Sequence, residues 1–445
     1  MHMSNQKRSF RILLTNGPVR HCYEALPSKV QERSPSMEAA IYYGFIPVRN
    51  LTPSNLDRSA IRATSSIDNI FGNPANDKKC FSPTESATLI KLYKNGHFSD
   101  LPGSIMLYRE KSNRSKRAGK ETVSHKCGFD IIGVSGSIAE ALTIQASYAV
   151  LEEEGFNDLE IEINSIGDKQ SREAFERDIT LYVRSIINKL PENIKELCKK
   201  NSYALFSSTE EEIESFIEDA PKPISYLSEE SRNHLKETLE YLEELEMPYS
   251  INHRLIAHKA LHGHTIFRIV PSNPNFKNGG ELVSAYGMRY NPLSRRLGYQ
   301  KSTPAVCSYL VYKKMNKSKK RLSRKPASPE FCFVHLGTAA KQKSLRVIDT
   351  LRKNRIPICH YLTKDKLAGQ MNTLEKLKMP YLVIMGHKEA LEGTVMIRDM
   401  ADHSQETIPL EELLPYLKRI RSKKIRSEKT NTRPIKTKKR LSVES

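Results

Sequence analysis

Three apolar runs of strand length, separated by two helical stretches, constrain the fold of the last quarter of the chain more than any other feature. The runs are "FCFVHL", "IPICHYL" and "YLVIMG", and the helical patterns occupy residues 338–354 and 364–378. Strands that alternate with helices of this length favour a βαβαβ unit with a partly parallel sheet. "TVMIRDM" then alternates as a further strand, and "LEELLPYLKRI" forms a closing helix. The sequence therefore predicts an independent α/β domain over residues 330–421.

Two basic segments flank this domain. Residues 313–329, "KKMNKSKKRLSRKPASP", hold eight basic residues and no acidic one, and their lysine, serine and proline are typical of a solvated linker. We place the linker proper at residues 316–329. Residues 422–445 have almost no apolar content, so we expect a basic tail that is disordered by itself.

The pattern of residues 1–315 predicts one mixed α/β core. "GFIPVRN", "CGFDIIG", "LEIEINSIGD" and "HTIFRIV" resemble strands, and "AEALTIQASYAVLEEEG" has the apolar spacing of an amphipathic helix that ends at Gly155. Residues 170–247 are helical in pattern and locally acidic, which indicates an inserted helical subdomain. We interpret "TPAVCSYLVYKKM" (303–315) as a segment that starts at a helix N-terminus.

The charge of the chain favours a polyanionic partner. Lysine and arginine number 71 against 51 aspartates and glutamates, which gives a formal net charge of +20. Nucleic acid is the simplest partner for such an excess. A soluble protein with one basic tail is the alternative that composition leaves open. The hydrophobic content of 38% is sufficient for packed cores and excludes a wholly disordered chain.

The seven cysteines are scattered, and none forms a CxxC pair. Neither a zinc knuckle nor a disulfide framework is indicated, so we expect the protein to be located in the reducing cytoplasm. No apolar run approaches the ~20 residues that cross a bilayer, and the first residues lack the pattern of a signal peptide. We therefore expect no membrane partner.

The segment "LIAHKALHGHTIF" (255–267) is rich in histidine. His258 and His262 are four residues apart, the spacing of two-histidine metal sites on a helix. The cation Lys259 follows the first histidine, no third ligand is evident, and "HTIFRIV" suggests a turn into a strand. We therefore predict no metal site, and leave open ordinary polar or core histidines and a patch that contacts RNA or a ligand.

The order of segments from about residue 10 to residue 420 resembles the histidyl-tRNA synthetases, which are class II aminoacyl-tRNA synthetases. The stretches that carry the resemblance are "AAIYYGFIPV", "LEIEINSIGDKQSREAFERDI", "IEDAPKPISYLSEESRNHLKETLEYLEELEMPYSINHRLI", "MRYNPLSRRLGYQKSTPAV" and "FCFVHLGTAAKQKSLRVIDTLRKNRIPI". The resemblance implies an α+β protein with an antiparallel-sheet core and a helical insertion, followed by an anticodon-binding-like domain.

The same resemblance implies that catalytic positions have changed. Where the family carries an R-G-L-D-Y-Y signature, Ala257 takes the place of the arginine and Ala260 that of the aspartate, so His258, His262 and His264 occupy a former catalytic loop. The arginine of motif 2 that holds the ATP α-phosphate falls near Leu107. Arg109 lies two residues further on, and could substitute only if the strand slipped by two.

Other pocket positions differ as well. Thr84 takes the position of the carboxylate that receives the substrate amino group, with Glu85 offset by one, and Lys126 replaces a glutamine that helps to bind histidine. Lys314 aligns with the arginine of motif 3 that clamps the γ-phosphate, whereas Arg289 and Tyr290 are retained. The candidates for substrate or ATP binding are thus Thr84, Glu85, Arg109, Lys126, Arg289, Tyr290 and Lys314.

Removing one preorganised donor to developing charge typically slows an enzyme ~100- to 1000-fold. Lysine is a poorer replacement for a bidentate arginine. We therefore expect a divergent paralogue that binds tRNA or a related RNA and has lost most or all histidine activation. Two alternatives stay open: an active histidine–tRNA ligase that uses ATP and Mg²⁺, and a synthetase-like regulatory subunit of another enzyme.

Basic residues of the motif 2 loop, "KSNRSKRAGKETVSHK", and of the linker are candidates for contacts with RNA phosphates. They are Arg114, Lys116, Arg117, Lys120, Lys319, Lys320 and Arg321. Solvated flexible chain is the alternative reading of both runs. Class II cores pair through the motif 1 region, so the resemblance also implies a homodimer.

Overall fold

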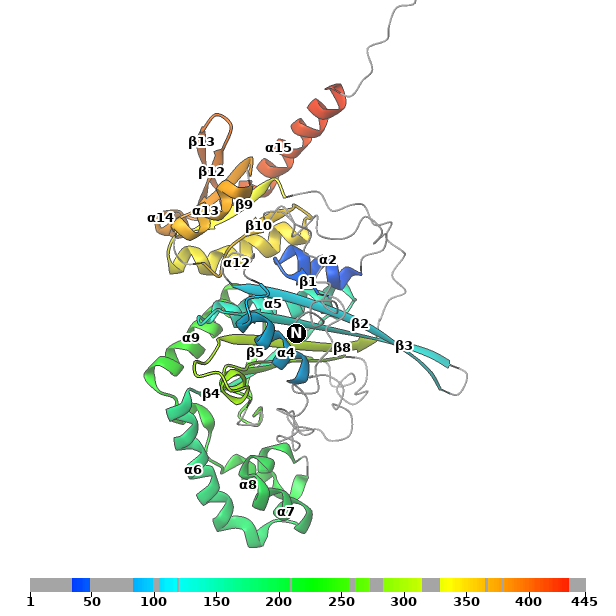
Figure 1. Cartoon of the computed structure of the whole chain (residues 1–445), viewed down its shortest axis with the longest axis vertical. Coiled ribbons are helices and arrows are strands. Elements are labelled where there is room, and N and C mark those ends of the chain that lie inside the picture. Colours follow the sequence, from blue (N-terminus) through cyan, green and yellow to red (C-terminus); the bar gives the residue numbers. More distant parts are fainter. Residues whose placement is uncertain are drawn as a thin grey trace, which may run out of the picture.

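The computed structural model contains two sheets with helices between and around them. It describes residues 34–48, 83–98, 104–117, 120–208, 210–256, 261–272, 283–313, 329–364, 367–377 and 379–431. Figure 1 shows the larger sheet in the middle of the molecule, the smaller sheet beyond α12 at one end, and helices α6, α7 and α8 at the other. No helix in the described part of the chain has the length and apolar character that a membrane span needs.

The larger sheet is mainly antiparallel, as predicted. Its described strands are β1 (Ile46–Pro47), β2 (Ile105–Arg117), β3 (Lys120–Ile132), β4 (Leu159–Gly167), β5 (Tyr249–Ile251), β6 (His264–Pro271), β7 (Val283–Arg289) and β8 (Ala305–Lys313). Their order is β1-β2-β3-β8-β7-β6-β4-β5, and only the outer pairs β1/β2 and β4/β5 are parallel. The segments expected to be strands near residues 130, 163 and 267 are β3, β4 and β6.

Two expectations for this sheet are wrong. Residues 305–313 form strand β8 rather than the beginning of a helix. Both faces of β8 are buried, so its apolar residues run continuously, and such a run cannot be told from a buried helix by periodicity. The supposed motif 2 loop is also largely strand, because β2 and β3 pair continuously from Ile105↔Ile132 to Arg117↔Lys120. This hairpin extends past the rest of the sheet (Figure 1).

Helix α5 (Ile138–Glu153) lies at the centre of the molecule. Nearly all of its residues are buried, because one side packs on β3, β7 and β8 while α2 (Pro35–Tyr42) and α9 (Glu229–Glu244) cover other sides. A helix that is apolar all round is stable only when it is enclosed in this way. The opposite face of the sheet packs against α4 (Pro83–Lys94).

The predicted helical insertion lies between β4 and β5. It comprises α6 (Lys169–Ile186), α7 (Glu192–Lys200), α8 (Glu214–Glu218), α9 and four short 3₁₀ helices, Ile187–Lys189, Ser202–Ser207, Glu211–Ile213 and Pro223–Tyr226. Asp168 caps α6 by accepting the Ser171 N–H at 2.9 Å. Phe175 stacks on Tyr203 with ring centroids 5.6 Å apart in a core of its own. A short helix, α11 (Pro292–Arg296), connects β7 to β8.

The smaller sheet confirms the predicted βαβαβ pattern. Its elements are β9 (Phe331–His335), α12 (Thr338–Lys353), β10 (Ile358–His360), α13 (Leu367–Leu377), β11 (Tyr381–Met385), α14 (His387–Glu392), β12 (Thr394–Asp399), β13 (Gln405–Pro409) and α15 (Leu410–Asn431). The order is β10-β9-β11-β12-β13, with β10, β9 and β11 parallel and the last two strands antiparallel. Strand β13 was not foreseen, since four of its five residues are exposed and give no alternation.

The boundaries beyond this domain differ in part from expectation. Helix α15 continues to Asn431, so the first ten residues of the expected disordered tail are helical. Lysine and arginine form helices readily, which apolar content alone does not reveal. Residues 432–445 and nearly all of the expected linker (316–329) lie outside the described residues.

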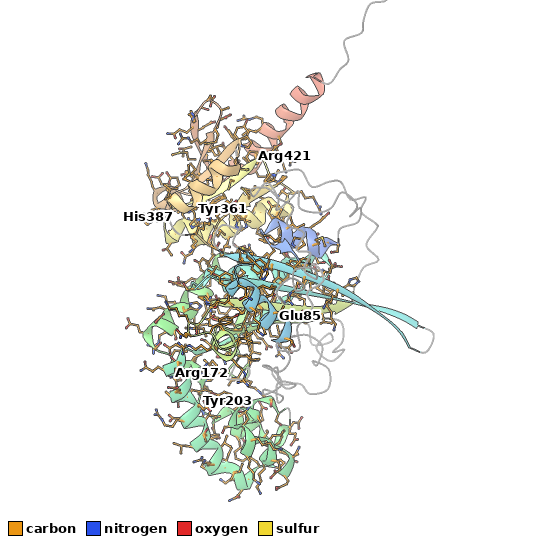
Figure 2. All side chains as sticks on the ribbon, viewed as in Figure 1. Glu85, Arg172, Tyr203, Tyr361, His387 and Arg421 are labelled. Carbon is orange, nitrogen blue, oxygen red and sulfur yellow. The ribbon has the colours of Figure 1, made fainter. Side chains whose placement is uncertain are left out.

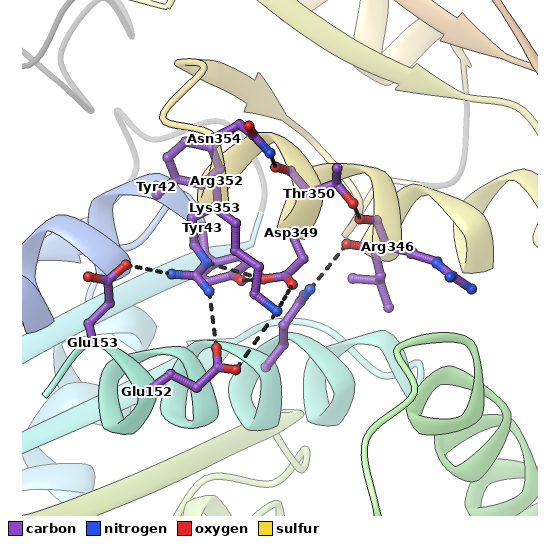
Figure 3. A network of polar contacts seen from close by, with 12 residues as sticks. Tyr42, Tyr43, Glu152, Glu153, Arg346, Asp349, Thr350, Arg352, Lys353 and Asn354 are labelled. Atoms are coloured by element: carbon purple, nitrogen blue, oxygen red, sulfur yellow. Dashed lines mark hydrogen bonds and ion pairs between the residues drawn. The ribbon is translucent and has the colours of Figure 1, made fainter. Parts of the chain in front are cut away.

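Helix α12 joins the two parts of the molecule. Leu345 and Ile348 of α12 belong to the same apolar cluster as α2 and α5. Figure 3 shows the polar network beside them. Arg352 donates to Glu153 at 3.0 Å, to Glu152 at 3.2 Å and to Asp349 at 3.1 Å. Both apolar and ionic contacts therefore fix the smaller-sheet domain against the core.

Candidate functional site

A buried polar cluster lies on the face of the larger sheet that α4 covers. It consists of Glu85 from α4, Arg109 from β2, Asp130 from β3, Tyr309 from β8 and Tyr290 after β7. The pleat explains why these residues meet. Leu107 pairs with Asp130 and Arg109 with Gly128, so residues of β2 and β3 at alternate positions point to the same face. Figure 2 shows Glu85 beside the sheet.

Gly128 makes room for the guanidinium group. A Cβ atom at this position would lie 3.3 Å from Arg109 Nη2 and 3.2 Å from the ring of Tyr309. Contacts of this length are tighter than ordinary packing allows. The glycine therefore leaves room for the Arg109 guanidinium and the Tyr309 ring on this face of the sheet.

Both terminal nitrogens of Arg109 are engaged by partners inside the protein. Its Nη2 donates to Asp130 Oδ2 at 2.5 Å and to the Tyr309 hydroxyl, and its Nη1 donates to Glu85. The guanidinium lies over the Tyr309 ring, 5.0 Å from its centroid. The Tyr290 hydroxyl donates to the second oxygen of Asp130 at 2.9 Å. Exposure of the Arg109 side chain is 7%, and that of Asp130 is 0%.

The electrostatics of the cluster follow from burial. Burial raises the pKa of Asp130 to about 6, although Arg109 and the Tyr290 hydroxyl oppose the shift. Burial also raises the pKa of Tyr290 and of Tyr309 well above the usual value, so both phenols stay protonated. Burial opposes the charge of Arg109, but Asp130, Tyr309 and Glu85 raise its pKa. The cluster is therefore a cation enclosed by two carboxyl groups.

The surroundings of the cluster are apolar. Leu107, Met288 and Cys307 are buried on the same face and belong to one apolar cluster with Tyr290 and Tyr309. Burial raises the pKa of the Cys307 thiol well above the usual value, which keeps it un-ionised and unreactive. Leu107 in particular offers no donor to a phosphate.

The outer edge of the cluster is cationic. Lys111 lies two residues after Arg109 on the same face of β2, and its ammonium group is 2.7 Å from Glu85 Oε1. Lys126 is its cross-strand partner on β3 and is partly buried. Glu85 thus links the buried arginine to the exposed end of the face.

Arg289 is not part of this cluster. Adjacent residues of a strand point to opposite faces, and Arg289 faces α5 while Tyr290 faces α4. Its guanidinium donates to both oxygens of Glu140, at 2.6 and 2.5 Å, and to the carbonyls of Val134 and Gly136. Burial opposes ionisation, but Arg289 and His234 lower the pKa of Glu140 to about 2. Arg289 therefore ties the sheet to α5.

The structure describes only part of the histidine-rich segment 255–267. His258 and Ala257 lie outside the described residues. His262 is fully buried, its ring nitrogens have no hydrogen-bond partner among the described residues, and burial lowers its pKa to about 3. His264 has a left-handed backbone (φ 59°), and its ring lies 5.1 Å from that of His234. Among the described residues no group of three or more His, Cys, Asp or Glu could hold a metal ion.

The remaining sequence candidates have other positions. The carbonyl of Thr84 accepts the Thr88 hydroxyl at 2.9 Å within α4. Arg114, Lys116, Arg117 and Lys120 occupy the paired ends of β2 and β3. Lys314, Lys319, Lys320 and Arg321 lie outside the described residues.

Sequence reasoning missed Asp130 and Tyr309. The signal for Asp130 was an aspartate inside the otherwise apolar strand "CGFDIIG", since a buried carboxylate needs a partner. It also missed a second ion pair on this face, in which Arg268 Nε donates to Glu162 at 2.9 Å. Nothing in the local sequence pairs these two residues, because the contact depends on the β4/β6 register.

Comparisons with known proteins address both parts of the chain. A family model described as "Anticodon binding domain" matches residues 330–420. The chain is 26% identical over 355 residues to a histidine–tRNA ligase of Dehalococcoides mccartyi, covering 78% of this chain and 84% of that protein. It is 28% identical over 297 residues to the histidine–tRNA ligase of Aquifex aeolicus, covering 67% of this chain and 71% of that one. The crystal structure of apo S. aureus histidyl-tRNA synthetase aligns with a TM-score of 0.44 and 18% identity, covering 86% of this chain and 93% of that one.

Proposed function

Because this chain is a histidyl-tRNA synthetase-family, class II synthetase-like protein, we propose that it binds tRNA or a related RNA and has lost most or all histidine activation. The C-terminal domain carries the similarity to anticodon-binding domains, and the β2–β3 hairpin, which extends past the rest of the sheet, adds a basic segment. Phosphate contacts of this kind give affinity that falls with added salt.

The hydrogen bonds of Arg109 support the proposal that histidine activation is lost. Stabilising a phosphate as charge develops needs donors that are free and preorganised. The terminal nitrogens of Arg109 already donate to Glu85, Asp130 and Tyr309, so a phosphate would have to displace two carboxyl groups from a buried cation. Breaking a buried ion pair typically costs about 3–5 kcal/mol.

The residues present do not fit an ATP triphosphate with Mg²⁺. Leu107 is apolar and buried, Arg289 is engaged with Glu140 on the opposite face, and Thr84 replaces a carboxylate with a hydroxyl group. ATP and Mg²⁺ would be required only if the ligase activity survives.

An adenylation assay tests this part of the proposal. The purified chain, with histidine, ATP and magnesium, is assayed for exchange of pyrophosphate into ATP, with a histidine–tRNA ligase of the same family as positive control. We expect a rate at least ~1000-fold below the control, from the loss of two or more donors. Exchange at a rate close to the control would contradict the proposal.

One observation favours an active ligase. Arg109 lies in one cluster with Glu85, so a substrate that attracted Glu85 away would free its Nη1 group. Its Nη2 group would stay bound to Asp130 and Tyr309. An active ligase would then show histidine-dependent exchange that Arg109→Lys abolishes. A stable complex with another enzyme in place of RNA would support the alternative of a regulatory subunit.

RNA binding is tested separately. The chain is titrated with an unmodified tRNA transcript at several salt concentrations, and affinity is expected to fall steeply as salt rises. Neutral variants at Arg114, Lys116, Arg117 and Lys120 of the hairpin should reduce this salt dependence. We further propose a homodimer, by analogy with class II cores, and a cytoplasmic location, consistent with the scattered cysteines.

A further inference from the structure

Helix α15 is docked on the C-terminal domain along its first half only. Leu413 and Leu417 are buried in the apolar cluster of that domain, and the Tyr416 hydroxyl donates to Glu406 at 2.7 Å. Arg421 lies 3.7 Å from Glu330 and donates to the Arg355 carbonyl at 3.4 Å. The helix then continues for ten residues to Asn431, and Figure 1 shows it extending away from both sheets.

The second half of the helix is strongly cationic. Residues 418–431 contain one acidic residue, Glu428, against seven basic ones. The basic residues are Lys418, Arg419, Arg421, Lys423, Lys424, Arg426 and Lys429. Lys418 and Arg421 still contact the domain, at Asn354 and at the Arg355 carbonyl. A helix of 22 residues is about 33 Å long at 1.5 Å per residue, so the part after Ser422 extends well beyond these contacts.

Helical geometry separates the docked side from a basic side. Residues 413, 417 and 421 are spaced by four and define the docked side. Positions 419, 423 and 426 have i, i+4 and i+7 spacing and fall together on the opposite side of the helix. Arg419 is exposed, with its guanidinium 4.9 Å from the centroid of the Tyr416 ring. We call positions 419, 423 and 426 the basic stripe.

We propose that the projecting half of α15 is an arm whose basic stripe binds the phosphate backbone of the RNA held by the C-terminal domain. The inference rests on the proposed function, since it assumes that the chain binds RNA. Charge complementarity selects a polyanion. An anionic membrane is a poorer match, because residues 418–431 contain only two apolar side chains, Ile420 and Ile425, and so lack an apolar face to insert into lipid.

The test compares two triple variants with the same change in net charge. The first, Arg419→Gln/Lys423→Gln/Arg426→Gln, neutralises the basic stripe. The control, Lys169→Gln/Lys199→Gln/Lys388→Gln, removes three lysines whose side chains are 70%, 51% and 77% exposed on other helices. Each full-length protein is titrated with an unmodified tRNA transcript over a range of salt concentrations.

Neutralising the basic stripe should weaken binding about tenfold near 0.1 M salt and lower the slope of log Kd against log salt by about 2, whereas the control should match the wild type. A chain that ends at Ser422 should lose at least as much tRNA affinity. This shortened chain provides a second test in case the triple variant misfolds. Circular dichroism checks that each protein is folded.

The outcomes separate the two proposals. Wild-type protein that binds no tRNA at any salt overturns the proposed function, and the arm with it. Wild-type binding that neither the stripe variant nor the shortened chain alters overturns the arm alone. Stripe-dependent binding to phosphatidylserine vesicles without any effect on tRNA also overturns the arm as an RNA-binding element.

Discussion

At the scale of single residues, Arg109 decides whether this sheet face is a structural cluster or a working pocket. We predict that Arg109→Met lowers the free energy of unfolding by about 3–5 kcal/mol, because it leaves the Asp130 carboxyl buried without a counter-ion. Urea unfolding measures the loss. Lys111→Met on the same strand is the control, and with a side chain 62% exposed it should cost at most about 1 kcal/mol. Equal stability of the two variants would contradict a structural role for Arg109.

The buried His262 should make the fold sensitive to mild acid. Burial lowers its pKa to about 3, whereas an unfolded histidine titrates near 6.5. Between these values the unfolded chain binds the extra proton, so the free energy of unfolding falls as the pH drops below about 6.5. Arg172, which donates to the His262 carbonyl at 3.1 Å, further opposes protonation.

The free energy of unfolding of the wild type should fall between pH 7 and pH 5. We predict that this fall is about 2 kcal/mol smaller in His262→Leu. The measurement is urea unfolding at both pH values. His264 and His360, whose pKa values burial also lowers to about 4, keep part of the acid sensitivity in the variant. The exposed His387→Gln serves as control for the loss of one histidine side chain. An unchanged pH dependence in His262→Leu would count against a neutral buried ring.

The family resemblance selected Glu85, Arg109 and Tyr290 as candidates for substrate or ATP binding, and the structure brings these three residues into one cluster. It grouped Arg289 with them because motif position says nothing about the direction of a side chain in a strand. Asp130 and Tyr309 complete the cluster from strands far apart in sequence, and only the sheet register brings them to Arg109.

At the scale of elements, the larger sheet depends on one close approach at Gly287 in β7. A Cβ atom there would lie 2.1 Å from Phe267 Cζ and 2.6 Å from the Cys307 carbonyl oxygen. We predict that Gly287→Ala costs about 1–3 kcal/mol, because the Phe267 ring must leave its position on β6. Thermal unfolding with a matched Gly136→Ala control tests this, since the nearest atom to a Cβ at Gly136 is 4.0 Å away. A Gly287→Ala protein as stable as the control would show that the sheet relaxes freely.

The strands show which features of secondary structure a local sequence pattern can predict. Half-buried strands such as β4 alternate and were predicted, whereas β8 is covered on both faces and was mistaken for the start of a helix. The basic stretch after residue 110 was expected to be a loop because the family resemblance places the motif 2 loop there. Its pairing over the whole length of β2 and β3 is a property of the partner strand and could not be inferred from either segment alone.

At the scale of the whole molecule, Arg352 is the polar centre of the contact between the two domains. Its side chain is 5% exposed and donates to Glu152 and Glu153 of α5. We predict that Arg352→Met costs about 2 kcal/mol, the range for hydrogen bonds to charged groups. Calorimetry should then show separate unfolding of the two domains where the wild type unfolds in one transition.

Arg346→Met is the matched control for this prediction. Arg346 lies on the same helix (Figure 3). It pairs with Glu246 at 2.7 Å, but the two side chains are 56% and 70% exposed. An exposed pair of this kind contributes at most about 1 kcal/mol. If both variants unfold in a single transition at the wild-type temperature, the apolar contacts of α12 alone hold the domains together.

The enclosure of α5 has a consequence for how such a chain can be divided. Helix α5 packs against the larger sheet and also shares an apolar cluster with α12, so it contributes to the cores of both parts of the molecule. A fragment starting at residue 330 would present Leu345 and Ile348 to water and leave Arg352 without its α5 acceptors. Such a fragment should self-associate or precipitate under conditions in which the intact chain stays monodisperse. Gene fusions or truncations that are cut at the linker should aggregate for the same reason.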